Sequence, residues 1–367
     1  MDIFAELGID GYINAHDTYT VYGGSRMPPE CFEAMRQVSQ HFVDFAQLQR
    51  AVGEKIAQMT HNEAAYVTNG AAGALQLAAA TCLAQGDLFR YMRLPRTSGA
   101  DEIIVLHAQH NAYDAAILAS GAKVVLVGDA DETLESDLVG AITEKTAGVF
   151  YFINSQYRRA SLSLEKTIEI AHARGVPVVV DAAAQLPPIS NLWEIARKGA
   201  ELVIFSGGKT LCGPQDSGLM VGKKEWIEDC HRFGAPAHGV CRACKTSREA
   251  VVGLWIALKK YMEMDHETHR RTLEIINRLI ADVLTREGIM THIMPYGPVG
   301  QTYPRLVVEM PQGYSAGEVA WHMLERRIYV GCDRAENSLY ISPLNLSNEE
   351  AQTVASALVA YFRGVEL

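Results

Sequence analysis

Short apolar runs alternate with amphipathic stretches through the middle of the chain. Each apolar run is rich in β-branched or small residues and ends in turn or polar residues, which predicts a series of strands. The predicted strands are 64–68, 102–106, 123–127, 148–153 and 176–180, and the predicted helices between them are 74–84, 135–146 and 163–174. Because strand and helix alternate throughout, we expect an α/β domain whose mostly parallel sheet is covered on both faces.

The two ends of the chain follow different patterns. Residues 1–60 combine a glycine- and tyrosine-rich segment with two helical stretches, and we expect an irregular arm followed by helices. Residues 61–255 carry the alternating pattern and form the predicted large domain. Residues 256–367 are expected to form a linker helix, within a long helical region at 247–285, and a small α+β domain. The elements predicted there are strand 304–310, helix 316–326, strand 338–342 and helix 348–362.

The composition limits the classes of function. The 367 residues carry a formal net charge of −10, with a pI near 5.7, which argues against a broad nucleic-acid surface because that would require a basic excess. The start of the chain has early acids and no sustained apolar run, and no later window approaches a membrane span, so we expect a cytoplasmic protein. Seven scattered cysteines, an odd number, argue against a disulfide framework.

The stretch 201–222, ELVIFSGGKTLCGPQDSGLMVG, places one lysine between two apolar runs. The runs ending at Phe205 and passing through Met220 predict two core strands, and the glycines between them predict a loop that carries Lys209. Burial lowers the pKa of a lysine amine toward the nucleophilic form that Schiff-base chemistry requires. An exposed turn lysine fits this stretch equally well, so residues elsewhere must decide.

Candidate ligand-binding residues follow three other predicted strands, at the sheet edge where open α/β sheets bind ligands. Asp181 directly follows a β-branched run, where a buried carboxylate requires a cation or several donors. His110 either stacks on a flat ring, transfers a proton or caps the next helix. The turn 69–73, NGAAG, leaves N–H groups at a helix start that can bind a phosphate, although close helix packing explains its small residues as well.

Four segments, taken in order, resemble those of the fold-type I enzymes that depend on pyridoxal 5'-phosphate (PLP). They are TNGAA at 68–72, HNAYD at 110–114, VDAAAQ at 180–185 and SGGKTLCGPQ at 206–215. Within these enzymes the chain resembles the selenocysteine-synthase-like group, related to L-seryl-tRNA selenium transferase, which also includes D-glucosaminate-6-phosphate ammonia-lyases. The likeness also covers 23–29 and reaches the carboxyl third. It implies a seven-stranded-type sheet in the large domain and a smaller α+β C-terminal domain.

The resemblance implies a role for each matching residue. Lys209 would bind PLP as a Schiff base, Asp181 would pair with the pyridine nitrogen, and His110 would stack on the ring. The phosphate would be bound by Gly70, Ala71, Ala72 and Ser206. Asn69 stands where related sequences more often have serine, so the backbone role of this turn carries over and that of the side chain does not.

The carboxyl third contributes one predicted substrate ligand. Fold-type I enzymes commonly bind the substrate α-carboxylate with an arginine of this region, and Arg305, at the start of a predicted strand, is the candidate. The alternative is a rim arginine that forms an ion pair with Glu309 or another acid.

The resemblance implies a PLP-dependent lyase that acts on a small hydroxylated amino acid, with D-glucosaminate 6-phosphate as one candidate. Lys209 would remove the Cα proton, and loss of the β-hydroxyl would lead to a 2-oxo-3-deoxy acid and ammonia. Racemase, aldolase or selenium- and sulfur-transfer chemistry, or PLP binding without turnover, are the alternatives. Selenocysteine synthases have an additional N-terminal tRNA-binding region, whereas the core motifs begin early here, so we expect no nucleic-acid partner. We also expect a homodimer or a higher homo-oligomer.

Two segments lie outside this scheme. The basic insertion 88–99 is either a loop over the site or an interface element. His238, Cys241 and Cys244 have a spacing that a metal could use, but one CxxC without a second ligand pair is weak support, and we expect no metal and reduced loop cysteines.

Overall fold

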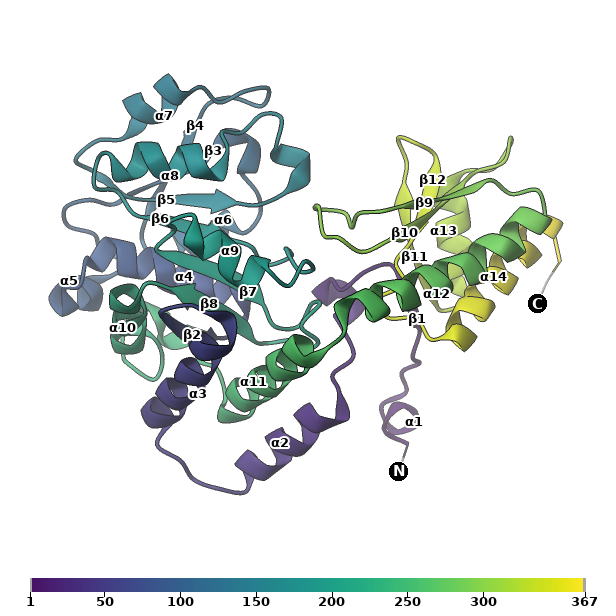
Figure 1. Ribbon diagram of the computed structural model, residues 1–367, viewed down its shortest axis with the longest axis horizontal. Coiled ribbons are helices and arrows are strands. Elements are labelled where there is room, and N and C mark those ends of the chain that lie inside the picture. The colour runs from purple at the N-terminus through teal and green to yellow at the C-terminus, as the bar shows by residue number, and fades with distance from the viewer. Residues whose placement is uncertain (1, 366–367) are drawn as a thin grey trace. The chain divides into compact units, whose positions relative to one another are not determined.

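The computed structural model describes residues 2–365, which form two compact units (Figure 1). The large unit is Met27–Glu263, and the small unit combines the described residues up to Arg26 with those from Met264 onward. The segment expected to be an arm at 1–60 is therefore divided. Its first part belongs to the small unit, and its two helices, α2 (Pro29–Ser39) and α3 (Phe45–Thr60), belong to the large unit.

A seven-stranded sheet forms the centre of the large unit. Its strands are β2 (Ala64–Thr68), β3 (Glu102–Leu106), β4 (Lys123–Val127), β5 (Thr146–Phe152), β6 (Val178–Asp181), β7 (Leu202–Ser206) and β8 (Gly218–Gly222). They are arranged in the order β2-β8-β7-β6-β5-β3-β4, and β8 alone runs antiparallel to its neighbours. The predicted mostly parallel sheet is therefore confirmed, and the carboxyl ends of β2, β3, β6 and β7 lie at one edge.

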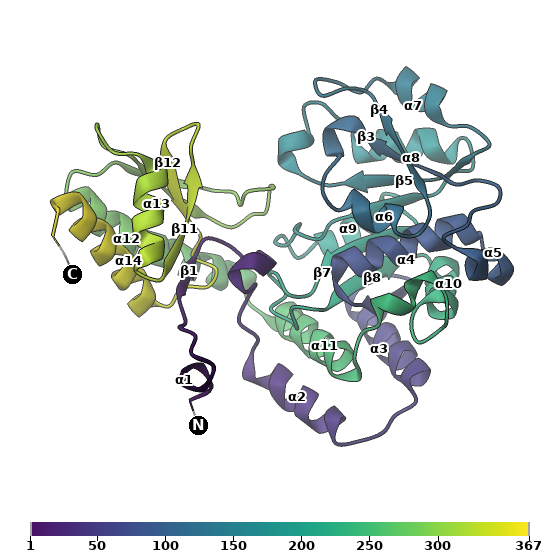
Figure 2. The same cartoon turned by 180° about the vertical axis from the view of Figure 1, so that it is seen from behind.

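Helices cover both faces of this sheet, as the two opposite views in Figures 1 and 2 show. One face carries α4 (Gly70–Ala84), α6 (Asp114–Leu118) and α10 (Lys224–Phe233), which pack against one another, and α5 (Leu88–Arg93) packs on α4. The other face carries α7 (Glu135–Ala141), α8 (Leu164–His172) and α9 (Asn191–Arg197). The alanine-rich α4 is buried along most of its length, which explains its lack of a polar face.

Several predicted boundaries differ from the structure. The helix predicted at 135–146 ends at Ala141, because a turn in which Thr146 Oγ1 accepts from the Thr143 N–H (3.0 Å) leads directly into β5. Helix α4 begins at Gly70, four residues before the predicted start. The insertion at 88–99 contains α5, which Asp87 caps through the N–H groups of Phe89 and Arg90.

The small unit contains a five-stranded sheet with helices α12 (His266–Arg286), α13 (Ala316–Glu325) and α14 (Asn348–Arg363). Its strands are β1 (Ile13–Ala15), β9 (Thr291–Met294), β10 (Arg305–Glu309), β11 (Ile328–Asp333) and β12 (Ser338–Ile341), in the order β1-β11-β12-β10-β9. The sequence pattern predicted β10 and β12 but missed β9 and β11. The N-terminal segment is not wholly irregular, because it forms α1 (Ile3–Leu7) and contributes β1, which pairs in parallel with β11.

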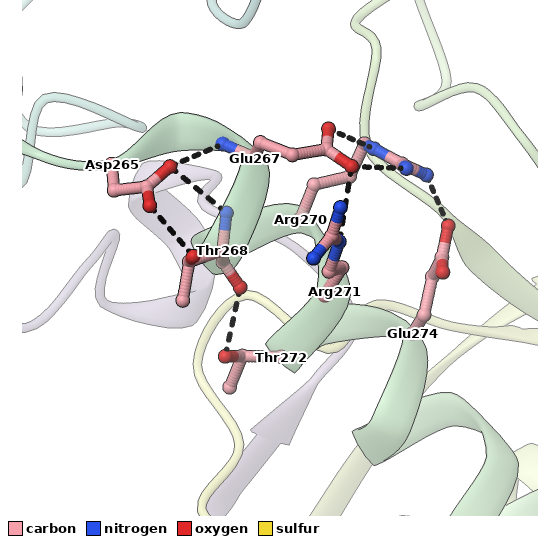
Figure 3. Close-up of polar contacts among 7 residues, drawn as sticks. All are labelled: Asp265, Glu267, Thr268, Arg270, Arg271, Thr272 and Glu274. Atoms are coloured by element: carbon pink, nitrogen blue, oxygen red, sulfur yellow. Dashed lines mark hydrogen bonds and ion pairs between the residues drawn. The ribbon is translucent and has the colours of Figure 1, made fainter.

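The long helical region predicted at 247–285 is divided into α11 (Arg248–Glu263) in the large unit and α12 in the small unit. Asp265 ends the continuity because its side chain caps α12, accepting from the N–H groups of Glu267 and Thr268 at 3.1 Å each (Figure 3). Glu267 then pairs with Arg270 and Arg271 on the exposed surface. These charged side chains give the new helix a solvated first two turns.

Among residues 2–365, no helix has both the length and the apolar composition needed to cross a bilayer.

Candidate active site

Lys209 lies on the loop that joins β7 to β8, as the sequence predicted. The loop is closed by backbone hydrogen bonds from Gly207 N–H to Ser217 O (2.9 Å) and from Gly213 N–H to Gly207 O (2.8 Å). Side chains would not fit at its start, because a Cβ at Gly207 would lie 2.1 Å from Ser217 Oγ. The lysine is half-buried, so the loop holds a cationic side chain at the carboxyl edge of the sheet.

Asp181 ends β6, the strand next to β7, at the same edge. Its Oδ1 accepts a hydrogen bond from Ala183 N–H at 2.8 Å. Burial raises the pKa of the Asp181 carboxyl, and the Ala183 N–H and the charge of Lys209 oppose that rise without cancelling it. The structure therefore brings Lys209 and Asp181 together electrostatically, and a further cation would stabilise this carboxylate.

The turn between β2 and α4 is open where an anion would bind. Gly70 has φ +78°, a left-handed conformation that favours glycine, and a Cβ there would meet no atom within 4 Å. Thr68 Oγ1 donates to Gly70 O (2.9 Å) and fixes the turn. Ala71 and Ala72 form the first turn of α4, whose N–H groups have no acceptor within the helix.

Three strands align the residues of this turn with Ser206. Thr68 pairs with Gly218 on β8, and Gly218 pairs with Ser206 on β7, so the three residues form one row across the sheet. Only glycine fits at position 218, because a Cβ there would lie 2.5 Å from both the carbonyl carbon and the oxygen of Gly70. The row is the reason that Ser206 reaches the same edge as Gly70.

Asn69 does not cap α4 through its side chain. Its Oδ1 is buried, has no hydrogen-bond partner among residues 2–365 and lies against Gly73, where a Cβ would approach it to 1.8 Å. A buried polar atom without a partner, beside open N–H groups, is the arrangement expected where a polar ligand completes the site. The backbone role predicted for this turn is thus compatible with the geometry.

His110 follows a short 3-10 turn, His107–Gln109, at the end of β3. Its Nδ1 lies 2.5 Å from Asp114 Oδ2 in the first turn of α6, while 56% of the side chain remains exposed. His110 does not cap α6, because the N-cap is Tyr113 and no side chain within the described residues caps this helix; the ring instead contacts the Asp114 side chain, and its exposed part is available to a ligand. The sequence analysis missed Asp114, although the i,i+4 spacing in HNAYD could have indicated the pair.

Arg305 lies in the small unit, at the start of β10. Its Nε donates to Tyr296 O (3.0 Å), and its guanidinium carbon lies 5.2 Å from the centre of the Tyr340 ring. Glu309, the alternative partner of Arg305, pairs instead with His292 Nδ1 at 3.3 Å. The ion pair between Arg305 and Glu309 that was considered from the sequence is therefore wrong.

Cys241 and Cys244 lie on the 3-10 turn Val240–Cys244 and contact α4. Cys244 Sγ donates to Gln76 Oε1 (2.9 Å), and Cys241 Sγ lies 4.0 Å from Gln76 O. Burial raises the pKa of both thiols, to about 12 for Cys241. Within the described residues, His, Cys, Asp and Glu side chains form no group of three that could bind a metal ion.

The large unit therefore has the features that PLP requires: an amine on a loop beside a buried carboxylate that lacks full charge compensation, and an open helix start with an unpaired buried amide oxygen. Lys209, Asp181, His110, Gly70 and Ser206 all lie at one sheet edge of one unit. The residues present fit the group.

Comparisons with known proteins agree with this geometry. Residues 30–292 match the family model described as SelA, L-seryl-tRNA selenium transferase. The chain is 33% identical over 267 residues to D-glucosaminate-6-phosphate ammonia lyase of Salmonella typhimurium strain 14028s, covering 71% of this chain and 70% of that protein. It is 31% identical over 284 residues to a 5'-C-glycyluridine monooxygenase-decarboxylase of a Streptomyces species, covering 75% of this chain and 69% of that protein.

Comparison with solved structures also finds similarity to a D-glucosaminate-6-phosphate ammonia-lyase. The structure of D-glucosaminate-6-phosphate ammonia-lyase matches with a TM-score of 0.85 and 26% identity, covering 99% of both chains. The structure described as SPT with PLP shares the fold, with a TM-score of 0.63 and 16% identity, covering 96% of this chain and 88% of that one. The chain therefore belongs to the L-seryl-tRNA selenium transferase family and is a PLP-dependent enzyme with the fold-type I architecture.

Proposed function

We propose that this enzyme is a lyase that releases ammonia from a small amino acid with a hydroxyl group on Cβ, and that D-glucosaminate 6-phosphate is the first substrate to test. The observation that carries the proposal is the Lys209–Asp181 pair, in which the lysine charge only partly offsets the burial of the carboxyl. The ammonia lyase similar to this chain over 71% of its length supports the reaction class.

The side chains of the large unit have distinct tasks in this reaction. When PLP is bound, it supplies an electron sink for the electron pair left at the substrate Cα. Lys209 Nζ would hold the cofactor through its aldehyde carbon and, once released by the substrate amine, would take the Cα proton. Asp181 stabilises a positive charge on the ring nitrogen, because this partly compensated buried carboxylate requires a cation.

Three further groups orient the reactants. The N–H groups of Gly70, Ala71 and Ala72, together with Ser206, bind the cofactor phosphate at the start of α4. The ring of His110, whose side chain is exposed, would stack on the cofactor ring. Arg305, whose guanidinium Nε donates to Tyr296 O, stays the predicted ligand of the substrate carboxylate.

The product follows from the position of the hydroxyl group. After proton removal the Cβ–O bond breaks, and the resulting enamine tautomerises and hydrolyses to a 2-oxo-3-deoxy acid and ammonia. The water lost from Cβ is regained in the hydrolysis, so the net change is the loss of ammonia.

Assembly and location are part of the proposal. Exposed apolar side chains at Phe32, Phe42 and Phe89 support a homodimer or a higher homo-oligomer, which light scattering of the purified protein would measure. We also propose a cytoplasmic location, and the net charge of −10 supports a small-molecule substrate and not a nucleic acid.

The test is incubation of the PLP-loaded protein with hydroxylated D- and L-amino acids and aminosugar acids, with and without phosphate. Ammonia and 2-oxo acid should appear in equal amounts with at least one of them. The variant Lys209→Ala should abolish release, while Lys259→Ala, at an exposed lysine of α11, should leave it unchanged. Racemisation, aldol cleavage or decarboxylation without ammonia release would reject the lyase assignment in favour of other PLP chemistry. A cofactor spectrum that no amine changes would indicate PLP binding without turnover.

A further inference from the structure

The contact between His110 and Asp114 joins the end of β3 to the start of α6. His110 Nδ1 lies 2.5 Å from Asp114 Oδ2, while the Asp114 side chain is only 5% exposed and His110 is 56% exposed. Asp114 Oδ1 is buried and has no hydrogen-bond partner in the part of the chain that the structure describes. A buried carboxylate with one unpaired oxygen is costly, so the bond to His110 is the main compensation that the described structure gives this charge.

This contact fixes the hydrogen on the imidazole ring. An ionised carboxylate accepts hydrogen bonds and cannot donate them, so Asp114 holds the hydrogen of neutral His110 on Nδ1. Nε2, the other ring nitrogen, takes no part in this contact. That nitrogen is left free to accept a proton and to give it up again.

A chain of hydrogen bonds ties the His110 turn to the segment that carries Asp181. Gln109 Oε1 accepts from Phe152 N–H (2.8 Å), and Ile153 N–H donates to Asp181 O (3.0 Å). Gln185 Nε2 donates to Ile153 O (2.9 Å). These bonds cross the ends of β3, β5 and β6, and a spacing of about 4.8 Å per strand separates the ends of β3 and β6 by roughly 10 Å. A cofactor ring and its substrate fill a gap of this order.

We propose that Asp114 is a positioning residue that holds His110 in the Nδ1–H tautomer, so that Nε2 delivers a proton to the departing β-hydroxyl. The inference deepens the proposed lyase function and rests on it. Lys209 Nζ takes the Cα proton, the Cα–H electron pair forms the Cα=Cβ bond, and the Cβ–O pair leaves with oxygen. The Nε2 proton of the imidazolium joins that oxygen and water departs, which leaves neutral His110 still donating through Nδ1 to Asp114.

The decisive variant is Asp114→Asn, which keeps the shape of the side chain and removes its charge. The new amide donates to Nδ1 and thereby shifts the hydrogen of neutral His110 to Nε2, where delivery of a proton would leave an imidazolate. Elimination of hydroxide should then slow by about 10²–10⁴-fold in kcat, with KM and PLP affinity little changed. Glu309→Gln, which alters the exposed His292–Glu309 pair, is the matched control and should change nothing.

Two readouts separate proton delivery from a structural role. Nitrogen-15 NMR of the cofactor-free protein should show Nδ1–H for His110 in the wild type and Nε2–H in Asp114→Asn. The 3-chloro analogue of the substrate loses chloride, which needs no proton, so the variant should eliminate chloride at the wild-type rate. His110→Gln should slow hydroxide loss much more than chloride loss, since loss of the stacked ring affects both reactions but loss of the proton donor affects only the first, and this variant covers the case in which Asp114→Asn does not fold.

These experiments distinguish failure of the proton-delivery role from failure of the lyase function. Equal slowing of hydroxide and chloride loss, or an unchanged tautomer in Asp114→Asn, would overturn the inference while the lyase function stands. A wild-type enzyme that binds PLP but eliminates neither group would overturn both.

Discussion

Replacement of Gly218 by alanine tests whether the row from β2 to β7 shapes the cofactor phosphate site. The new Cβ would lie 2.5 Å from the carbonyl carbon and oxygen of Gly70 and 2.6 Å from Thr68 Oγ1. Two of these atoms are backbone atoms that cannot rotate away, so the start of α4 must shift. Overpacking of this kind costs about 1–3 kcal/mol, and loss of the Thr68 Oγ1 hydrogen bond to Gly70 O costs about 1 kcal/mol more.

We therefore expect Gly218→Ala to lower the free energy of unfolding of the large unit by about 2–4 kcal/mol. The affinity for PLP should fall by about 10–100-fold, because the N–H groups of α4 no longer point at the phosphate. Denaturation followed by tryptophan fluorescence reports mainly on this unit, since Trp193, Trp226 and Trp255 lie in it and Trp321 does not. Titration of the cofactor-free protein with PLP measures the affinity.

Gly140→Ala is the matched control. Gly140 is an exposed position in α7 where a Cβ would meet no atom within 4 Å, so alanine should be neutral or stabilise the helix by about 0.5–1 kcal/mol. If Gly218→Ala has wild-type stability and binds PLP as tightly as the wild type, the close approach of β8 to the α4 turn does not define the site.

Two further predictions concern pH in the cofactor-free protein, one on the Asp181 carboxyl and one on the His231 ring. Burial raises the pKa of Asp181 in the folded state, so the folded protein binds that proton more tightly and its free energy of unfolding falls as pH rises through this pKa. The stability of Asp181→Asn relative to the wild type should therefore increase between pH 4 and pH 7 in denaturation experiments. A constant difference would contradict the assignment. Burial, aided by the charge of Arg50 and opposed by that of Glu228, lowers the pKa of His231 to about 4. On acidification the unfolded chain is therefore protonated first, and the free energy of unfolding should fall by about 1–2 kcal/mol between pH 6.5 and pH 4. His231→Gln should remove that loss, and an unchanged acid profile in the variant would show that another group is responsible.

Much of the large unit was predictable because its strands are short apolar runs bounded by turns. The strands 64–68, 102–106 and 123–127 were predicted at their observed bounds, since their residues are almost all apolar or β-branched. Periodicity missed strands of the small unit for the opposite reason. In β9, THIM, three of the four side chains are exposed, and β1 is only three residues long, so neither carries an alternating pattern that the sequence reveals.

The sequence predicted the site residues that lie at or after the ends of strands. It did not predict the residues whose roles depend on contacts between distant or separately folded segments. Asp181 stands directly after an apolar run and Lys209 lies on the glycine-bounded loop between two such runs, which marks both in the sequence. Gly218 is important only because β8 folds back antiparallel between β2 and β7, a pairing that local sequence does not encode. Asp114 was quoted in the motif but its role depends on the contact with His110, which forms only once α6 begins at that residue.

The central claim is that Lys209 carries the cofactor beside Asp181, and one measurement tests it most directly. The PLP-loaded protein would be reduced with borohydride, digested and analysed by mass spectrometry for a pyridoxyl-modified lysine. The account predicts one modified peptide, which contains Lys209, and no modification in Lys209→Ala. Modification of a different lysine, or of none in a protein that binds PLP, would contradict it.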